Sequence, residues 1–93
     1  MKRYLLFALA ISLACAPKKS DKEKLAEQVK QEFLHAWNGY KQHAWGDDAL
    51  KPLSKSSKNW YDASLLMTPV DAFDTMILMG LDEEAAEAKE LIF

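Results

Sequence analysis

The chain has 93 residues and carries 12 Lys and Arg residues against 14 Asp and Glu residues, a formal net charge of −2. That length allows at most one small domain, since domains typically comprise roughly 100–150 residues. The balanced charge and a pI near 5.6 exclude a strongly basic nucleic-acid-binding protein. The single cysteine excludes a disulfide scaffold, and 49% hydrophobic residues exclude a compositionally disordered chain.

Residues 1–14 have the features of a signal peptide. Lys2 and Arg3 supply a positive start, and an unbroken run of eleven apolar and small residues follows at positions 4–14. At about 1.5 Å per residue, a helix of that length falls well short of a bilayer core of about 30 Å. The length is that of a signal-peptide hydrophobic region, so the sequence predicts an exported protein.

The end of this run, residues 11–15 with the sequence ISLAC, resembles a bacterial lipobox. In that motif the cysteine is acylated and becomes the first mature residue, so we expect lipid attachment at Cys15 and a membrane-anchored lipoprotein on the periplasmic or cell-surface side. Plain secretion is the alternative; cleavage after Ala16 would then leave Pro17 as the first residue of the mature protein. Residues 15–19 would form the tether. The lysines in and after it are mixed with acids, which favours a solvated segment over a lipid-binding patch.

A capping box predicts where the first helix begins. Ser20 and Glu23 have the Ser-x-x-Glu spacing in which each side chain binds the other residue's backbone amide. Apolar residues then recur every three or four positions, as on the apolar face of a helix: Leu25, Val29, Phe33, Ala36, Trp37, Tyr40 and Ala44. Gly46 is expected to end this helix. Residues 47–67 show no period and contain Pro52, so they are expected to form a loop.

Two further helices are predicted after this loop. The second is expected to begin with Thr68 as its cap, Pro69 at the first helical position and Asp71 closing another capping box. Gly80 is a natural C-terminal stop. The acids at 82–84 then suit the positive end of a third helix. The fold class is therefore all-α, with three helices in helix–loop–helix–turn–helix order.

The chain stops on three consecutive large apolar residues, Leu91-Ile92-Phe93. Burying such side chains stabilises a fold by roughly 1.5–3 kcal/mol each and requires a partner surface. No cap or polar tail follows them, so we interpret this end as a truncation of a longer chain.

Spacing alone identifies no catalytic residue and no metal site. Asp71 and Asp74 are three positions apart, on one face of a helix, where they could act together. Asp71 equally suits a cap, whereas Asp74 on an apolar helix needs a partner if it is buried. His35 and His43 would point about 80° apart on a helix and make a poor metal pair.

Other chemistry-bearing side chains are also ambiguous. Asp47 and Asp48 indicate calcium only faintly, because the spacing of an EF-hand is absent. Five aromatic residues could stack on sugars, although packing in a core or interface is the more usual role: Trp37, Tyr40, Trp45, Trp60 and Tyr61. The sequence contains no glycine-rich phosphate loop and no Gly-x-Ser-x-Gly motif.

Two longer stretches resemble a specific family. Residues 33–56 follow the pattern AWxGYxxxAWGxDxLxP…SK, and residues 68–81 follow DAxDTMxxMGL. Together and in this order they resemble the N-terminal start of the class I α-1,2-mannosidases, glycoside hydrolase family 47. The departures are small: Asp47 stands where a histidine is common, and Phe73 where leucine is usual.

The resemblance implies an (α/α) barrel (αα-toroid) much longer than this chain, with residues 20–93 as its incomplete N-terminal part. It implies an inverting exo-glycosidase that removes α-1,2-linked mannose from oligosaccharides or glycoprotein glycans, using two carboxylates and a bound calcium ion. In the family these carboxylates and the calcium ligand come later, so we expect no catalytic residue and no metal ligand here. Asp71 matches an acid near the site and is expected to contact substrate, whereas Asp74 is expected to be structural.

Two hypotheses follow for the function. In the first, the chain is the leader and first barrel helices of an α-1,2-mannosidase and is inactive alone. In the second, it is a small helical lipoprotein that acts as a binding or interaction module. The first is favoured, because the second leaves an ordered resemblance over some sixty residues as coincidence or relic.

Overall fold

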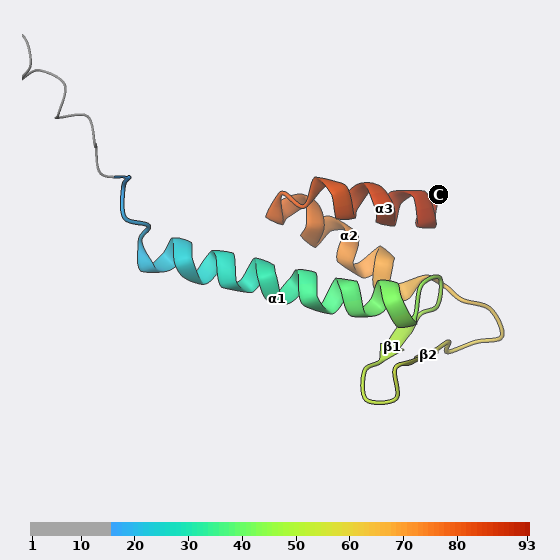
Figure 1. Ribbon diagram of the computed structural model, residues 1–93. Helices are drawn as coiled ribbons and strands as arrows, with labels where there is room; N and C mark the ends of the chain where they lie inside the picture. The colour runs from blue at the N-terminus through green and yellow to red at the C-terminus, as the bar shows by residue number, and fades with distance from the viewer. Residues whose placement is uncertain (1–15) are drawn as a thin grey trace, which may run out of the picture.

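The computed structural model describes residues 16–93, so the predicted signal peptide and Cys15 lie outside the described residues. The elements follow in the order α1 (Asp21–His43), β1 (Ala49–Lys51), β2 (Ser56–Lys58), α2 (Met67–Met79) and α3 (Asp82–Ile92) (Figure 1). The three predicted helices and their order are confirmed. No helix among residues 16–93 is long and apolar enough to cross a membrane.

The predicted capping box begins α1. The Glu23 amide donates to Ser20 Oγ at 3.3 Å, and the Ser20 amide donates to Glu23 Oε2 at 2.6 Å. Hydrogen bonding to Ser20 lowers the pKa of Glu23; the bond to the Ser20 backbone has the larger effect and that to the Ser20 side chain the smaller. The helix ends at His43, slightly before the predicted stop, and Gly46 turns the chain with φ of +87°.

The start of α2 differs from the prediction. The helix begins at Met67, after Leu66 in a left-handed conformation, and no side chain within the helix caps it. Thr68 donates its hydroxyl to the carbonyl of Asp48 at 2.7 Å instead of capping. The predicted cap at Thr68 and the capping box with Asp71 are therefore wrong. Instead Asp48, in the preceding loop, accepts hydrogen bonds from the first turn of α2.

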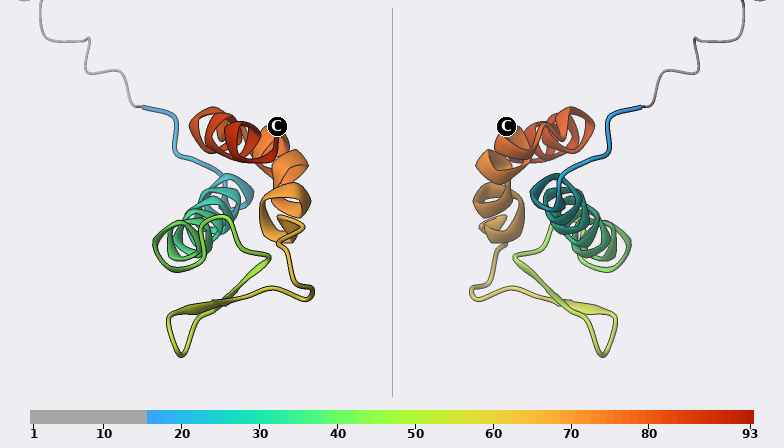
Figure 2. Two further views of the ribbon diagram at one scale, coloured as in Figure 1. Left: turned by 90° about the vertical axis from the view of Figure 1, so that its right-hand side faces the viewer. Right: turned by 90° about the vertical axis from the view of Figure 1, so that its left-hand side faces the viewer.

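The loop between α1 and α2 contains a β-hairpin, where the sequence predicts a loop alone. Strands β1 and β2 pair antiparallel, with Ala49 opposite Lys58 and Lys51 opposite Ser56. Lys55, in the turn, has φ of +51°. Strands of three residues are too short for an alternating pattern to stand out. The hairpin lies to one side of the C-terminal turns of α1 (Figures 1 and 2).

The core lies where α1 packs beside the α2–α3 pair (Figure 2). Gly80 ends α2 as predicted, with φ of +69°, and α3 then turns back along α2 (Figure 1). The buried apolar side chains come from all three helices and their connections: Trp37, Tyr40, Ala44, Met76, Leu81 and Ala88. Lys41 Nζ on α1 also donates to both carboxylate oxygens of Glu87 on α3, each at 2.6 Å.

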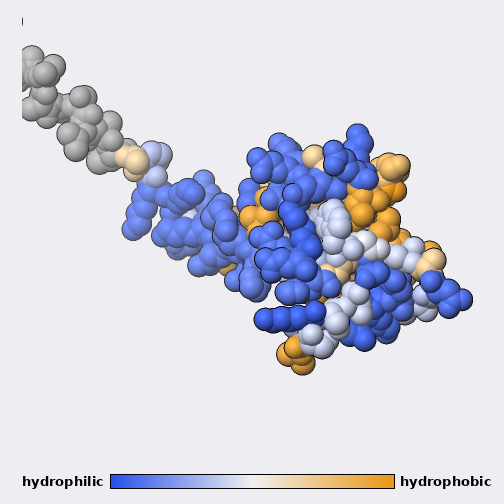
Figure 3. Space-filling model, turned by 45° about the vertical axis from the view of Figure 1, so that its right-hand side comes forward, coloured by the Kyte–Doolittle hydropathy of each residue, from blue (hydrophilic) through white to orange (hydrophobic). Residues whose placement is uncertain are grey.

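Large apolar side chains remain exposed on the described residues. Leu53 is fully exposed at the hairpin turn, Leu78 is 86% exposed on α2, and Phe93 is 91% exposed after α3. Hydrophobic surface accordingly interrupts the polar surface in several places (Figure 3).

Candidate functional site

A buried carboxylate organises the loop that precedes α2. The side chain of Asp48 is fully buried, and both of its oxygens accept hydrogen bonds from the far end of the loop. Oδ2 accepts from the Trp60 amide at 3.2 Å, and Oδ1 accepts from the Leu65 amide at 2.6 Å. The Ser64 hydroxyl and the Met67 amide also donate to Oδ1, at 3.2 and 3.3 Å. Asp48 is therefore the acceptor that determines where α2 begins.

The hydrogen bonds keep Asp48 ionised in spite of its burial. Burial alone raises the pKa of its carboxyl group, but the bonds from the Trp60, Leu65 and Met67 amides and the Ser64 hydroxyl outweigh it, so the pKa lies below its usual value. The Asp48 backbone takes part as well, since its amide donates to Asn59 Oδ1 at 2.8 Å and its carbonyl accepts from the Thr68 amide at 3.1 Å.

Asp47 extends the same network. Its carboxylate accepts hydrogen bonds from the Ser57 hydroxyl and, at 2.9 Å, from Asn59 Nδ2. These two bonds lower the pKa of Asp47. Its carbonyl accepts from the Tyr40 hydroxyl at 2.8 Å, and burial raises the pKa of that tyrosine. Asp47, which stands where the family commonly has histidine, therefore has hydrogen-bond partners of its own. Through these bonds and those of Asp48, the two aspartates are joined to the hairpin and to the rest of the loop.

Asp71 lies at a groove beside this network. The groove has a volume of about 670 Å³ and runs between α1, the loop and the first turns of α2. Asp71 is exposed, and no hydrogen bond or ion pair joins its side chain to another of residues 16–93. The lining combines apolar, hydroxyl, carboxylate and indole groups: Phe33, Asp48, Ala49, Trp60, Met67, Thr68, Asp71, Ala72 and Thr75. Such a mixture suits a polyhydroxylated ligand.

The other predicted carboxylate of this pair is not brought into the groove. Asp74 is exposed, does not line the cavity, and accepts a hydrogen bond from the Thr75 amide at 2.7 Å. The structure therefore places Asp71, and not Asp74, at the groove.

The five aromatic residues divide into two groups. Trp37 stacks on Tyr40 at 5.3 Å between ring centroids and meets Trp45 edge-on at 5.8 Å. Trp37 and Tyr40 belong to the core, as expected for most of the aromatic residues, whereas Trp45 packs at its edge and is 44% exposed. Trp60 is 50% exposed at the groove, and Tyr61 is 68% exposed. The sequence could not separate these groups, because burial depends on where the loop lies.

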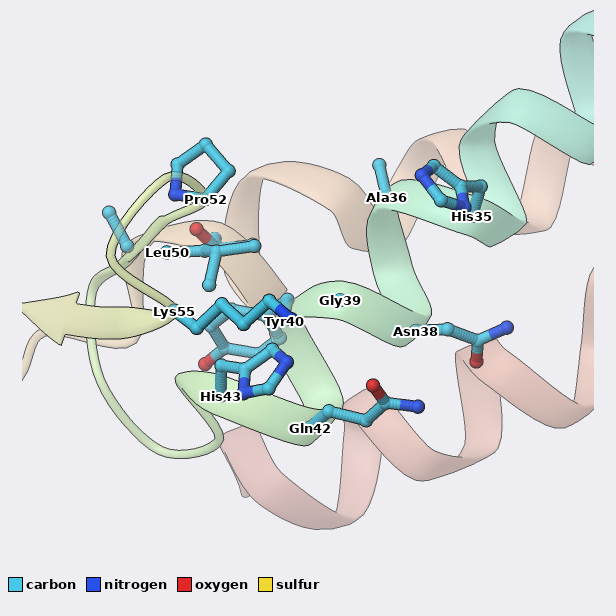
Figure 4. Close-up of a pocket in the computed structure, with 12 residues that line it drawn as sticks. His35, Ala36, Asn38, Gly39, Tyr40, Gln42, His43, Leu50, Pro52 and Lys55 are labelled. Carbon is cyan, nitrogen blue, oxygen red and sulfur yellow. The ribbon is translucent and has the colours of Figure 1, made fainter.

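A second groove, of about 830 Å³, lies between α1 and the hairpin and contains the two histidines (Figure 4). Lys55 extends from the hairpin toward Gly39 and Tyr40, whereas His35 and His43 lie at the two ends of the α1 wall (Figure 4). Within residues 16–93, no three His, Cys, Asp or Glu side chains are grouped so that they could hold a metal ion.

Comparison with known proteins identifies the class first. The model of glycosyl hydrolase family 47 matches residues 32–93, more than half of the chain. The chain belongs to this family of glycoside hydrolases, which confirms the resemblance read from its two motifs.

Several relatives carry more specific names. The chain is 47% identical over 64 residues to the endoplasmic reticulum mannosyl-oligosaccharide 1,2-alpha-mannosidase of Rattus norvegicus, a match that covers 69% of this chain and 9% of that protein. It is 48% identical over 60 residues to the human protein of the same name, covering 64% of this chain and 8% of that protein. A mannosyl-oligosaccharide 1,2-alpha-mannosidase of Arabidopsis thaliana is 36% identical over 81 residues, with coverage of 87% and 14%. The chain thus spans 8% to 14% of the length of these relatives.

Proposed function

We propose that this chain is the N-terminal part of an α-1,2-mannosidase, an inverting exo-glycosidase that hydrolyses α-1,2-linked mannose. The observation that carries the proposal is the family match over residues 32–93, together with relatives that are named for this activity and are 36% to 48% identical to the chain. The small share of those relatives that the chain spans supports a longer working protein, in which residues 20–93 supply the first helices of an (α/α) barrel.

The catalytic groups belong to the remainder of such a protein. Inverting hydrolysis needs a general acid and a water-activating carboxylate about 6.5–9.5 Å apart. The resemblance assigns both of them to later segments, so the 93 residues alone are expected to be inactive. The family also implies calcium. Because residues 16–93 hold no group of side chains suited to a metal ion, we assign no step at this site to it.

Asp71 is proposed to contact the substrate. Its carboxylate is exposed at the groove and is not engaged by other described residues, so it can accept hydrogen bonds from sugar hydroxyls. Asp48 lines the same groove, but its oxygens already accept bonds from the loop. The substrate would be a mannose-containing oligosaccharide or a glycoprotein glycan.

The leader provides the cellular context of the proposal. Residues 1–14 would export the protein, and lipid on Cys15 would anchor it, with residues 15–19 as the tether. The enzyme would then act outside the inner membrane, where it meets mannose-containing glycans.

The native polypeptide tests this proposal. We expect an antibody against residues 20–93 to detect a protein several times larger than 10.6 kDa in the source cells. The immunopurified protein should hydrolyse α-1,2-mannobiose, and NMR should show β-mannose as the first product because the reaction inverts the anomeric centre. Intact mass would also show the acyl chains on Cys15. A 10.6-kDa or slightly smaller protein without hydrolase activity would contradict the enzyme assignment and favour the small binding module.

A further inference from the structure

We propose that Trp60 is a sugar-stacking platform, which together with Asp71 gives this chain a mannose-binding subsite of its own. The inference rests on the proposed function, because the sugar is the one that an α-1,2-mannosidase would bind. It assigns a role to a residue outside the two family motifs, in the loop between them.

The backbone of Trp60 is held in place by a buried group. Its amide donates to Asp48 Oδ2 at 3.2 Å, and the preceding residue, Asn59, binds both the Asp48 amide and the Asp47 carboxylate. Two consecutive loop residues are thereby fixed to a fully buried aspartate. A platform on a loop must be anchored in this way, since stacking requires a ring whose position is set before the ligand arrives.

The ring of Trp60 is contacted by a lysine and is otherwise half exposed. Lys58 Nζ lies 4.9 Å from the centroid of the ring, within the range of a cation–π interaction. Lys58 is the last residue of β2 and pairs with Ala49, which also lines the groove. Despite this contact the side chain of Trp60 is 50% exposed. A large indole surface is therefore available beside a cavity of about 670 Å³.

The groove has the chemistry of a sugar-binding site. A pyranose has an apolar face of C–H groups, which packs on an aromatic ring, and a rim of hydroxyl groups, which needs acceptors and donors. Trp60 supplies the ring, Asp71 supplies an acceptor, and Thr75 belongs to the same lining. Asp71 comes from the first turns of α2, whose start is set by the same Asp48 that holds Trp60. One buried residue thus positions both walls of the subsite.

Trp45 provides an internal comparison. It is 44% exposed and lines a smaller cavity of about 320 Å³ together with Glu87. That carboxylate is already bound at both oxygens by Lys41, and the Trp45 ring packs against Trp37 and Tyr40. Trp45 is therefore about as exposed as Trp60, but the carboxylate beside it is not available to accept hydrogen bonds from a sugar. It is the matched control.

Saturation-transfer difference NMR of the complete 93-residue chain with α-1,2-mannobiose tests the inference. We expect saturation of the sugar C–H protons, and a loss of affinity of roughly tenfold in Trp60→Ala because the stacking surface is removed. Trp60→Phe should retain part of the affinity, and Trp45→Phe should leave it unchanged. The Trp60 substitutions spare the backbone bond to Asp48, and far-UV circular dichroism of each variant checks the fold.

The outcomes separate this inference from the function on which it rests. Unchanged affinity in a folded Trp60→Ala, with a loss in Asp71→Asn, would overturn the platform and leave the mannosidase assignment in place. Absence of α-1,2-mannobiose binding by the folded wild-type chain would overturn the subsite. Hydrolysis of α-1,2-mannobiose by the native polypeptide decides the function separately, since it does not require this chain to bind sugar alone.

Discussion

Two regions of this chain are held together by different forces. The helices pack through apolar side chains, with Met76 and Ala88 fully buried between them, whereas the loop of residues 44–66 is organised by hydrogen bonds to Asp48. Apolar packing is non-directional and tolerates small adjustments, but a carboxylate fixes each donor in a particular direction. The groove lies where the two regions meet, with Trp60 on the loop and Asp71 on α2, so the position of Trp60 in it depends on directional bonds.

Replacing Asp48 should have the largest effect. Asp48→Ala leaves the amides of Trp60, Leu65 and Met67 without their acceptor, and we expect Tm to fall by roughly 20 °C or more. Asp48→Asn should be less damaging, because its amide oxygen can still accept the bonds made to Oδ1, whereas its NH2 group would face the Trp60 amide. Circular dichroism melts measure the change. Asp62→Ala, at an exposed position, is the control and should melt like the wild type, and a similar loss there would contradict the special role of Asp48.

A core substitution should show the contrast between the two regions. Met76→Ala removes a fully buried side chain and should destabilise the fold by about 2–4 kcal/mol. Leu78→Ala, on the same helix but 86% exposed, should change the free energy of unfolding by less than about 0.5 kcal/mol.

Hydrogen exchange then tells the two kinds of damage apart. In Met76→Ala the Trp60 and Leu65 amides keep their acceptor, so their exchange should rise only as far as global stability falls. Selective loss of protection at those amides in Met76→Ala would show that the loop has no independent organisation.

Acid should weaken the loop before the helical core. The pKa values of Asp47 and Asp48 are lowered in the folded chain, whereas an unfolded aspartate titrates near about 3.9. Their contribution to stability is complete above that value and is lost as the pH falls through the lowered folded values. We expect Tm to fall below about pH 4 in melts recorded from pH 2 to 7. Asp47→Asn should reduce this fall in Tm at low pH. An unchanged dependence of Tm on pH would contradict the contribution assigned to the Asp47 carboxylate.

The limits of sequence reasoning follow the same division. The capping box at Ser20 and the stop at Gly80 were predictable, because each depends on residues within one helical turn. The start of α2 was not, since its acceptor, Asp48, lies 19 positions before Met67. The sequence marked Asp71 through the family pattern, but the separation of Trp60 from the buried aromatic residues required the loop to be placed in space.

The smallest effect concerns an ion pair between the helices. Lys41 and Glu87 join α1 to α3 at 2.6 Å, yet their side chains are 34% and 42% exposed, so solvent screens the attraction. A double-mutant cycle with Lys41→Met and Glu87→Gln should give a coupling of about 0.5 kcal/mol, and 1 M salt should reduce it. A coupling above about 2 kcal/mol would mean that directional polar contacts hold the helices as well as the loop, and the contrast between the two regions would then fail.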